Sequence, residues 1–271
     1  LFLKRCVVGG IERVFEINRN FRNEGADSSH SPEFAMLEYY QAYADYNDMA
    51  TLTRELIQEA ALAVHGTLNF ELVDGGTRDL SGEWDQISVF PSVSKAIGKA
   101  ITPETPIEEL RRLCADAGIA HDPKAIHGKL VEELLEHYVV EHLKKPTFVM
   151  DYPVDTSPLV REHRTQKGTA EKWDLYIDGY EAGTGYSELV DPVIQRERLI
   201  EQARLGSKRF PNKVLQKLGN KILIELLLER LSKSKLINKI VVATTTNDED
   251  IELLKFVEKI GYHTYAGSEN D

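Results

Sequence analysis

The pattern of apolar and polar positions predicts a β-hairpin near the start of the chain. Residues 13–20 place Val14, Phe15 and Ile17 among charged side chains, which is typical of a half-buried strand. A second extended run covers residues 34–40. The segment between the two runs is rich in Gly, Asp, Ser and Pro, the residues that favour loops. We therefore expect two strands joined by a polar loop.

A second hairpin is predicted further along. Residues 147–153 form a β-like run, and residues 173–178 and 181–189 are two more extended runs on either side of Gly179. The last two runs would form the hairpin.

Helical spacing of apolar residues predicts the elements that flank the strands. A short helix is expected before Gly9-Gly10, and Asn47-Asp48 are expected to cap a helix that runs to Gly66. Residues 67–105 carry many Gly and Pro and are expected to be less regular. Two further helices are predicted at residues 107–117 and 129–143.

The pattern changes after about residue 203. A helix at 222–231, a strand at 239–245, a helix at 251–260 and an extended run at 263–265 alternate as in a parallel α/β unit. We therefore predict an α/β protein with two parts, residues 1–202 and residues 203–271. Residues 203–271 would form a second, truncated parallel α/β domain.

Charge and composition narrow the possible functions. The net charge is −11, but residues 204–271 hold 12 Lys+Arg against 9 Asp+Glu, a net +3, so the first 203 residues carry −14. An acidic body disfavours strong nonspecific nucleic-acid binding. No apolar run is long enough to cross a bilayer and no secretory leader is visible, so a cytoplasmic protein without membrane contacts is expected. Cys6 and Cys114 favour reduced thiols over a disulfide or a zinc site.

The first hairpin carries side chains suited to a nucleotide and an amino acid. Arg22 offers a planar fork for a phosphate or carboxylate, Phe34 a face for a purine, and Glu38 a carboxylate for an ammonium. Even spacing places Phe34, Glu38 and Tyr40 on one face of a strand. The alternative is that Arg22 and Glu24 form a surface ion pair and Phe34 is a core residue.

The second hairpin carries a pair of carboxylates. Asp174 and Glu181 lie on adjacent predicted strands and could share a Mg²⁺ at a triphosphate, because this cation prefers oxygen ligands. Gly183 and Gly185 would allow a ligand to approach the backbone closely. The alternative is a solvated acidic face with turn glycines.

Taken together, the motifs of the two hairpins are specific. FRNEG, then H-x-PEF, then E-x-Y in the first hairpin resembles motif 2 of class II lysyl-tRNA synthetases. The later segments TFVMDYP, SPLVRE and EAGTGYSEL are similar to that family's pattern between motifs 2 and 3. The resemblance covers about residues 1–202 and implies for them an α+β catalytic domain, with an antiparallel sheet and flanking helices.

The resemblance implies an ATP- and Mg²⁺-dependent ligase that converts lysine to lysyl-adenylate and passes the lysyl group to tRNA(Lys). Arg22 would contact the α-phosphate and the lysine carboxylate. The other implied roles are Glu24 at the adenylate, His30 at the triphosphate, Phe34 at the adenine, Asp174 and Glu181 at Mg²⁺, and Glu38, Tyr40, Tyr186 and Glu188 at the lysine side chain.

Three departures from the family pattern matter. Many members have Asn where this chain has Thr184, which affects the expected contact to the lysine carboxylate. Intact members are homodimers, and no segment here matches motif 1, the dimerisation element, or motif 3. We therefore expect impaired activity, with a noncatalytic lysine- or ATP-binding protein as an alternative.

The segment ARLGSKRFPNK resembles a different family, the sugar cytidylyltransferases. The residues that match its nucleotide-binding signature include Arg204, Gly206, Ser207, Arg209 and Lys213. The glycine loop and cationic side chains would suit a nucleoside triphosphate, and a basic exposed loop is the alternative. A nucleotidyltransferase is thus a second possible function. The two resemblances meet at the tetrapeptide QARL, which is compatible with both families. This suggests a chimera in which segments of the two families are joined at a short sequence that they share.

Overall fold

The computed structural model describes residues 2–22, 31–73, 75–195, 215–233, 240–245 and 250–267. It contains two compact units. The first comprises Leu1–Glu16 and Leu37–Asp191, and the second comprises Ile17–Met36 and Pro192–Asp271. The predicted boundary between residues 202 and 203 lies outside the described residues and stays a prediction.

A four-stranded sheet forms the centre of the first unit. Its order is β5-β6-β7-β8, with β6 and β7 antiparallel, β7 and β8 antiparallel, but β5 and β6 parallel. The predicted antiparallel sheet is therefore a mixed sheet. The strands are β5 (Asp85–Ser88), β6 (Thr147–Pro153), β7 (Thr169–Ile177) and β8 (Tyr180–Tyr186).

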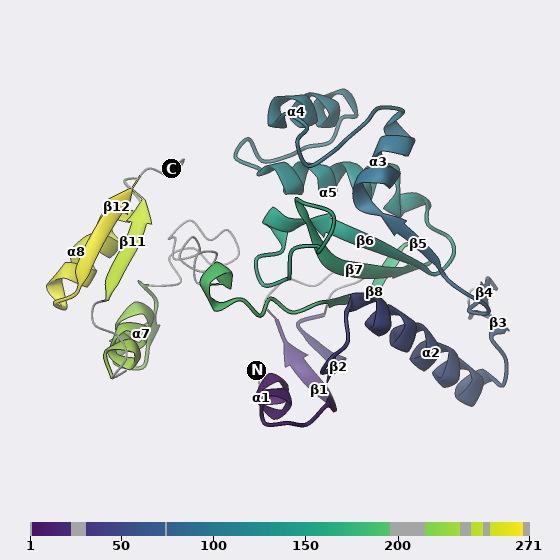
Figure 1. Ribbon diagram of the computed structural model, residues 1–271, viewed down its shortest axis with the longest axis horizontal. Coiled ribbons are helices and arrows are strands. Elements are labelled where there is room, and N and C mark those ends of the chain that lie inside the picture. Colours follow the sequence, from purple (N-terminus) through teal and green to yellow (C-terminus); the bar gives the residue numbers. More distant parts are fainter. Residues whose placement is uncertain are drawn as a thin grey trace. The chain divides into compact units, whose positions relative to one another are not determined.

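Helices cover both faces of this sheet (Figure 1). Val149 and Tyr176 face a core formed with three helices, whereas Phe148, Trp173 and Leu175 face a core shared with a fourth helix. Successive residues of a strand point to opposite faces, so one strand supplies both cores. The three helices on one side are α3 (Val89–Ile97), α4 (Ile107–Asp116) and α5 (His127–Tyr138), and the helix on the other side is α2 (Tyr46–His65).

The cap of α2 differs from the sequence prediction. Asp45, and not Asn47-Asp48, is the N-cap: its backbone is extended, and its carboxylate accepts hydrogen bonds from the backbone N–H groups of Asn47 and Asp48. The Asp48 carboxylate accepts in return from the Asp45 N–H at 2.9 Å, which completes a capping box. Gly66 ends the helix in the left-handed conformation at φ 71°, as predicted.

The segment 67–105 is more regular than the sequence suggested. It contains β3 (Asn69–Glu71), β4 (Thr77–Asp79), β5 and α3. The helix at 107–117 is confirmed, but the predicted helix 129–143 ends at Tyr138 and continues as a short 3-10 turn, η1 (Val140–His142). Val139, at φ −123° and ψ −60°, leaves the helical conformation at that point.

The first predicted hairpin is confirmed as β1 (Arg13–Phe21) and β2 (Glu33–Gln41), preceded by α1 (Phe2–Val8). The prediction of a half-buried strand is confirmed, and the structure shows which positions are covered. Phe15 and Ile17 are 69% and 73% exposed, while Val14, Asn18 and Asn20 on the alternate positions are half-buried. Side-chain alternation in this strand thus separates a half-buried face from an exposed one.

The C-terminal part of the second unit contains the expected parallel arrangement. β11 (Val241–Thr245) and β12 (His263–Gly267) pair in parallel and are joined by α8 (Ile251–Lys259). They are preceded by β9 (Lys217–Leu218), β10 (Lys221–Ile222) and α7 (Leu223–Ser232). A small core joins α7, β11 and α8 through Ile224, Leu228, Val242, Leu253 and Val257. Within the described ranges, no helix is both long and apolar enough to span a membrane.

Candidate functional site

Four of the predicted lysine-binding residues gather in the first unit. Glu38 and Tyr40 come from β2, Tyr186 ends β8, and Glu188 follows it. The Tyr40 hydroxyl donates a hydrogen bond to Glu38 Oε1 at 2.6 Å. Lys4 of α1 joins them: its Nζ lies 2.7 Å from Glu188 Oε1 and 5.6 Å from the centre of the Tyr40 ring. We call these five residues the ammonium cluster.

The electrostatics of the ammonium cluster favour a cation. Burial raises the pKa of the Tyr40 hydroxyl well above its ordinary value, and the hydrogen bond to Glu38 and the charge of Glu188 raise it further. Burial also raises the pKa of Tyr186, with the charge of Glu188 adding to the rise and that of Lys4 opposing it. The two phenols therefore stay neutral, and the Lys4 ammonium pairs with one of the two carboxylates, that of Glu188.

A cavity of about 310 Å³ opens beside this cluster, in the same unit. Tyr186 lines the cavity and also belongs to the ammonium cluster. The other lining residues include Asp174, Glu181 and Thr184 of the second hairpin, Lys172, and the segment 156–160. The carboxylates predicted to hold Mg²⁺ thus line the same cavity as Tyr186, one of the predicted lysine-binding residues.

The carboxylate of Asp174 is buried, at 6% exposure of the residue. Its Oδ2 lies 2.8 Å from Lys172 Nζ, and its Oδ1 is buried without a well-formed hydrogen bond to any described residue. Lys172 Nζ also lies 4.0 Å from the centre of the Tyr152 ring. Burial raises the pKa of Tyr152, and the Asp174 charge adds to this. A buried oxygen without a partner leaves a place for a hydrogen-bond donor or a cation.

Asp174 and Glu181 fit a Mg²⁺ that takes its other ligands from phosphates and water, because this ion is usually held by one or two carboxylates. The described part of the chain contains no group of three or more His, Cys, Asp or Glu residues that could hold a metal alone.

Two neighbours of the carboxylates differ from expectation. The Thr184 hydroxyl donates to the Trp173 carbonyl at 3.2 Å, so it is directed at the backbone. A Cβ at position 185 would lie 2.2 Å from the Trp173 ring, which means that Gly185 makes room for this ring and not for a ligand. At Gly183 nothing lies within 4 Å of such a Cβ, as expected for a position that a ligand could approach.

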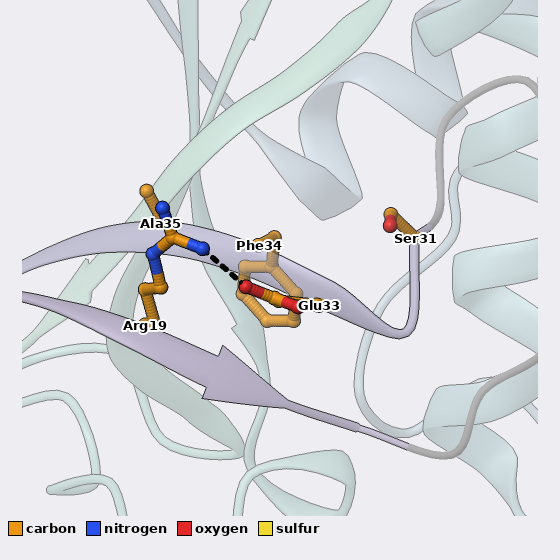
Figure 2. Close-up of a pocket in the computed structure, with 5 residues that line it drawn as sticks. All are labelled: Arg19, Ser31, Glu33, Phe34 and Ala35. Atoms are coloured by element: carbon orange, nitrogen blue, oxygen red, sulfur yellow. Dashed lines mark hydrogen bonds and ion pairs between the residues drawn. The ribbon is translucent and has the colours of Figure 1, made fainter.

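Arg22 and Phe34 contact each other in the second unit. The guanidinium carbon of Arg22 lies 5.4 Å from the centre of the Phe34 ring, a cation–π distance. Phe34 also lines a recess of about 340 Å³ with Arg19, Glu33 and two small residues. Figure 2 shows the Arg19 guanidinium paired with Glu33 Oε1 at 2.5 Å beside the Phe34 ring.

Several predicted residues lie outside the described ranges. These are Glu24 and His30 of the first hairpin loop, and Arg204, Gly206, Ser207, Arg209 and Lys213 of the second segment. Their roles, and the alternative ion pair of Arg22 with Glu24, stay predictions.

Sequence reasoning missed two cationic residues, Lys4 and Lys172. Lys172 could have been found, because it stands two residues before Asp174 and therefore shares its face of β7. Lys4 gave no local signal, since its contacts to Tyr40 and Glu188 join segments far apart in sequence.

Comparisons with known proteins identify two segments. The family model of class II tRNA synthetases (D, K and N) matches residues 1–216, and a cytidylyltransferase model matches residues 199–270. A lysine–tRNA ligase of Kineococcus radiotolerans is 63% identical over 207 residues, which are 76% of this chain and 41% of the relative. One of Mycolicibacterium gilvum is 60% identical over 209 residues, covering 76% and 42%.

A third relative is a bifunctional protein of lysylphosphatidylglycerol biosynthesis, LysX, from Gordonia bronchialis. It is 48% identical over 215 residues, which are 78% of this chain and 19% of that protein. The chain spans about two-fifths of the length of the lysine–tRNA ligases described above. Because the synthetase model matches well over half of its residues, the chain belongs to the class II tRNA synthetase family of the D, K and N type.

Proposed function

We propose that the first 202 residues carry the catalytic core of a lysine–tRNA ligase, which activates lysine with ATP. The observation that supports this most is the ammonium cluster, in which Glu38, Tyr40, Tyr186 and Glu188 gather and the Lys4 ammonium pairs with Glu188 beside the Tyr40 ring. The two relatives named lysine–tRNA ligase, 63% and 60% identical to this chain, support the same substrate.

The ammonium cluster accounts for selectivity among amino acids. The side chain of lysine ends in an ammonium, which Glu188 and Glu38 would neutralise and the Tyr40 ring would cover. A neutral side chain of similar length would gain no charge pairing with Glu38 or Glu188. Selectivity would therefore come from charge and not from length.

ATP would be held by residues outside the ammonium cluster. Asp174 and Glu181 would hold Mg²⁺, which supplies charge neutralisation at the phosphates when bound. Phe34 would stack on the adenine, and Arg22, already close to that ring, would hold the α-phosphate with its planar fork. Glu24 and His30 would complete the nucleotide contacts.

The proposed reaction has no covalent enzyme intermediate. The lysine carboxylate oxygen attacks the α-phosphorus of ATP, a mixed anhydride bond forms, and the bond to the β-phosphate oxygen breaks to release pyrophosphate. Arg22 stabilises the charge that builds on the α-phosphate oxygens. The chain places the reactants, since in-line positioning supplies much of the rate. A second step would transfer the lysyl group to tRNA(Lys) in a homodimer, as in the intact family.

Lysine binding tests the proposal most directly. Calorimetric titration of the chain should show L-lysine binding and no binding of norleucine, its uncharged analogue. Glu188→Gln should weaken lysine binding by about tenfold or more, because a charge-assisted hydrogen bond contributes about 1.5–3 kcal/mol. Glu109→Gln, which changes a carboxylate paired with Lys99 outside the cluster, is the matched control and should bind as the unmodified chain does. Equal binding of lysine and norleucine would refute the assignment.

Turnover is tested by lysine-dependent exchange of pyrophosphate into ATP. Exchange that disappears in Arg22→Ala would establish activation chemistry. Lysine binding without exchange would instead identify a noncatalytic or impaired core.

The second segment supports a second candidate function, nucleotide binding of the cytidylyltransferase type. Its family match covers residues 199–270, and its described part contains the parallel β11–α8–β12 unit. Arg204, Gly206, Ser207, Arg209 and Lys213 would hold the triphosphate. In the same calorimeter, binding of CTP in preference to ATP would favour this function.

We also propose that the two segments have separate origins. The two family matches overlap at residues 199–216, which include the tetrapeptide QARL. Sequencing the source DNA across codons 195–215 tests this, and an uninterrupted native reading frame would disprove a joined artefact.

A further inference from the structure

We propose that Lys4 is an internal competitor for the substrate ammonium, and that its displacement sets the affinity of the pocket for lysine. This inference rests on the proposed function, because it assumes that the ammonium cluster binds lysine. The Lys4 Nζ lies 2.7 Å from Glu188 Oε1 and over the Tyr40 ring at 5.6 Å. These are the contacts that the ammonium of a lysine ligand would make.

Glu188 and Lys4 form an ion pair that can open. Their side chains are partly buried, at 33% and 37% exposure, and water still reaches the pair. An ion pair that water reaches contributes little to stability, because the gain in charge attraction is offset by hydration and side-chain entropy. Breaking the pair is therefore easy if another cation takes its place.

The charge balance of the ammonium cluster explains why Lys4 would compete with a lysine ligand. Without Lys4, Glu38 and Glu188 would stand together beside two half-buried phenols, with no cation described near them. A ligand ammonium that enters while Lys4 stays in place meets a like charge at the same carboxylate. Binding is thus an exchange of one ammonium for another, and the affinity for lysine is lower than the two carboxylates alone would give.

Lys4 acts on the bound substrate through Glu188 and is therefore a positioning residue. Its displacement by lysine would change its own exposure, which would not happen to a lysine with a structural role alone. The Lys4 amine should become more exposed when lysine binds, whereas an amine that only holds α1 in place should become less reactive or stay unchanged.

Variants of the full chain test the competition by calorimetry with L-lysine in the absence of ATP. Lys4→Met keeps the length of the side chain and removes its charge, and it should bind lysine about tenfold more tightly. Lys4→Arg keeps the charge and should bind close to the unmodified chain. Lys99→Met removes a lysine from an ion pair with Glu109 elsewhere and is the matched control, with no change expected.

Chemical labelling tests the displacement in the unmodified chain, and so does not depend on the folding of any variant. The chain is acylated briefly with and without saturating L-lysine, and modification of Lys4 is measured by mass spectrometry relative to Lys99 in the same sample. This ratio should rise several-fold with lysine and stay constant with norleucine at equal concentration.

The outcomes separate the two proposals. If the unmodified chain binds lysine but Lys4→Met binds it equally or more weakly, and lysine leaves the labelling ratio unchanged or lower, the competition is refuted and the lysine pocket stands. If neither protein binds lysine, the proposed function fails and the competition fails with it. If only Lys4→Met binds lysine, both proposals are supported.

Discussion

The two hairpins of this chain have similar sequence patterns and different surroundings. Both alternate apolar and polar residues, but β7 lies between β6 and β8 with helices on both faces, while β1 and β2 form a two-stranded sheet of their own. Trp173 of β7 is 2% exposed, and Phe15 of β1 is 69% exposed. Alternation therefore predicts which residues share a face, but the helices that pack nearby decide whether that face is buried.

This difference extends to the functional side chains. Asp174 is fixed by its strand neighbours Trp173 and Leu175, which are buried in the core on the opposite face. Arg22 and Phe34 of the first hairpin contact each other, and the Arg22 backbone N–H donates to the Pro32 carbonyl at 3.0 Å. The predicted Mg²⁺ ligand Asp174 thus lies on a sheet packed on both faces, and the predicted adenine contact Phe34 lies on a two-stranded hairpin.

Substitution of an aromatic residue in each hairpin should give the largest difference in the free energy of unfolding. Trp173→Ala should lower the free energy of unfolding by about 3–5 kcal/mol, because it leaves a cavity and removes the hydrogen bond from its indole N–H to the Tyr46 carbonyl. Phe15→Ala should change it by less than about 0.5 kcal/mol. Urea denaturation followed by Trp84 fluorescence measures both. Similar costs at the two positions would show that the first hairpin is also packed.

The glycines of β8 give the next largest effect. Gly185→Ala should destabilise by about 1–3 kcal/mol, because its Cβ would meet the Trp173 ring at 2.2 Å. Gly183→Ala, with open space around its Cβ, is the control and should be neutral or stabilising by up to about 1 kcal/mol. Thermal unfolding distinguishes them. If both substitutions cost the same, close packing on Trp173 is not what requires Gly185.

The elements that could be predicted from the sequence are those with local signals. The strands of both hairpins, the helix ended by Gly66 and the parallel unit at 241–267 all follow from spacing and turn residues. The error at the α2 cap arose because Asp45, Asn47 and Asp48 are all capping residue types, and only backbone conformation selects among them.

The residues of the candidate site that belong to sequence motifs could be predicted. The residue that joins the site only through tertiary contacts could not. Glu38, Tyr40, Tyr186 and Glu188 were expected at one ligand and do lie together. Lys4 was not expected, because nothing in the heptapeptide of α1 marks a residue whose partner follows β8. The parallel pairing of β5 with β6 was missed for the same reason, since register between distant strands has no local signature.

Alkaline pH should expose the buried phenols of the sheet. Burial raises the pKa of Tyr176 above its ordinary value of 10.0. Above pH ~10 the unfolded chain loses this proton and the folded chain keeps it, so stability that is present below pH ~10 falls by about 1.4 kcal/mol per pH unit for each such group. Tyr176→Phe should reduce this slope in urea titrations between pH 9 and 11. An unchanged slope would mean that Tyr176 ionises freely in the folded protein.

The smallest expected effect is at the ion pair of the first hairpin. Arg19 and Glu33 are 78% and 47% exposed, so their attraction is screened by water and opposed by side-chain entropy. A double-mutant cycle of Arg19→Ala and Glu33→Ala should give a coupling energy below about 0.5 kcal/mol that vanishes in 1 M salt. The matched pair on the rigid hairpin is Lys172 and Asp174, whose side chains are 21% and 8% exposed. A cycle of Lys172→Met and Asp174→Asn should give a coupling energy several times larger, since either substitution alone leaves the other side chain's charge partly buried without its partner. Equal coupling energies would mean that the two hairpins hold their charged side chains with similar firmness, and the contrast between the packed hairpin and the open one would then be wrong.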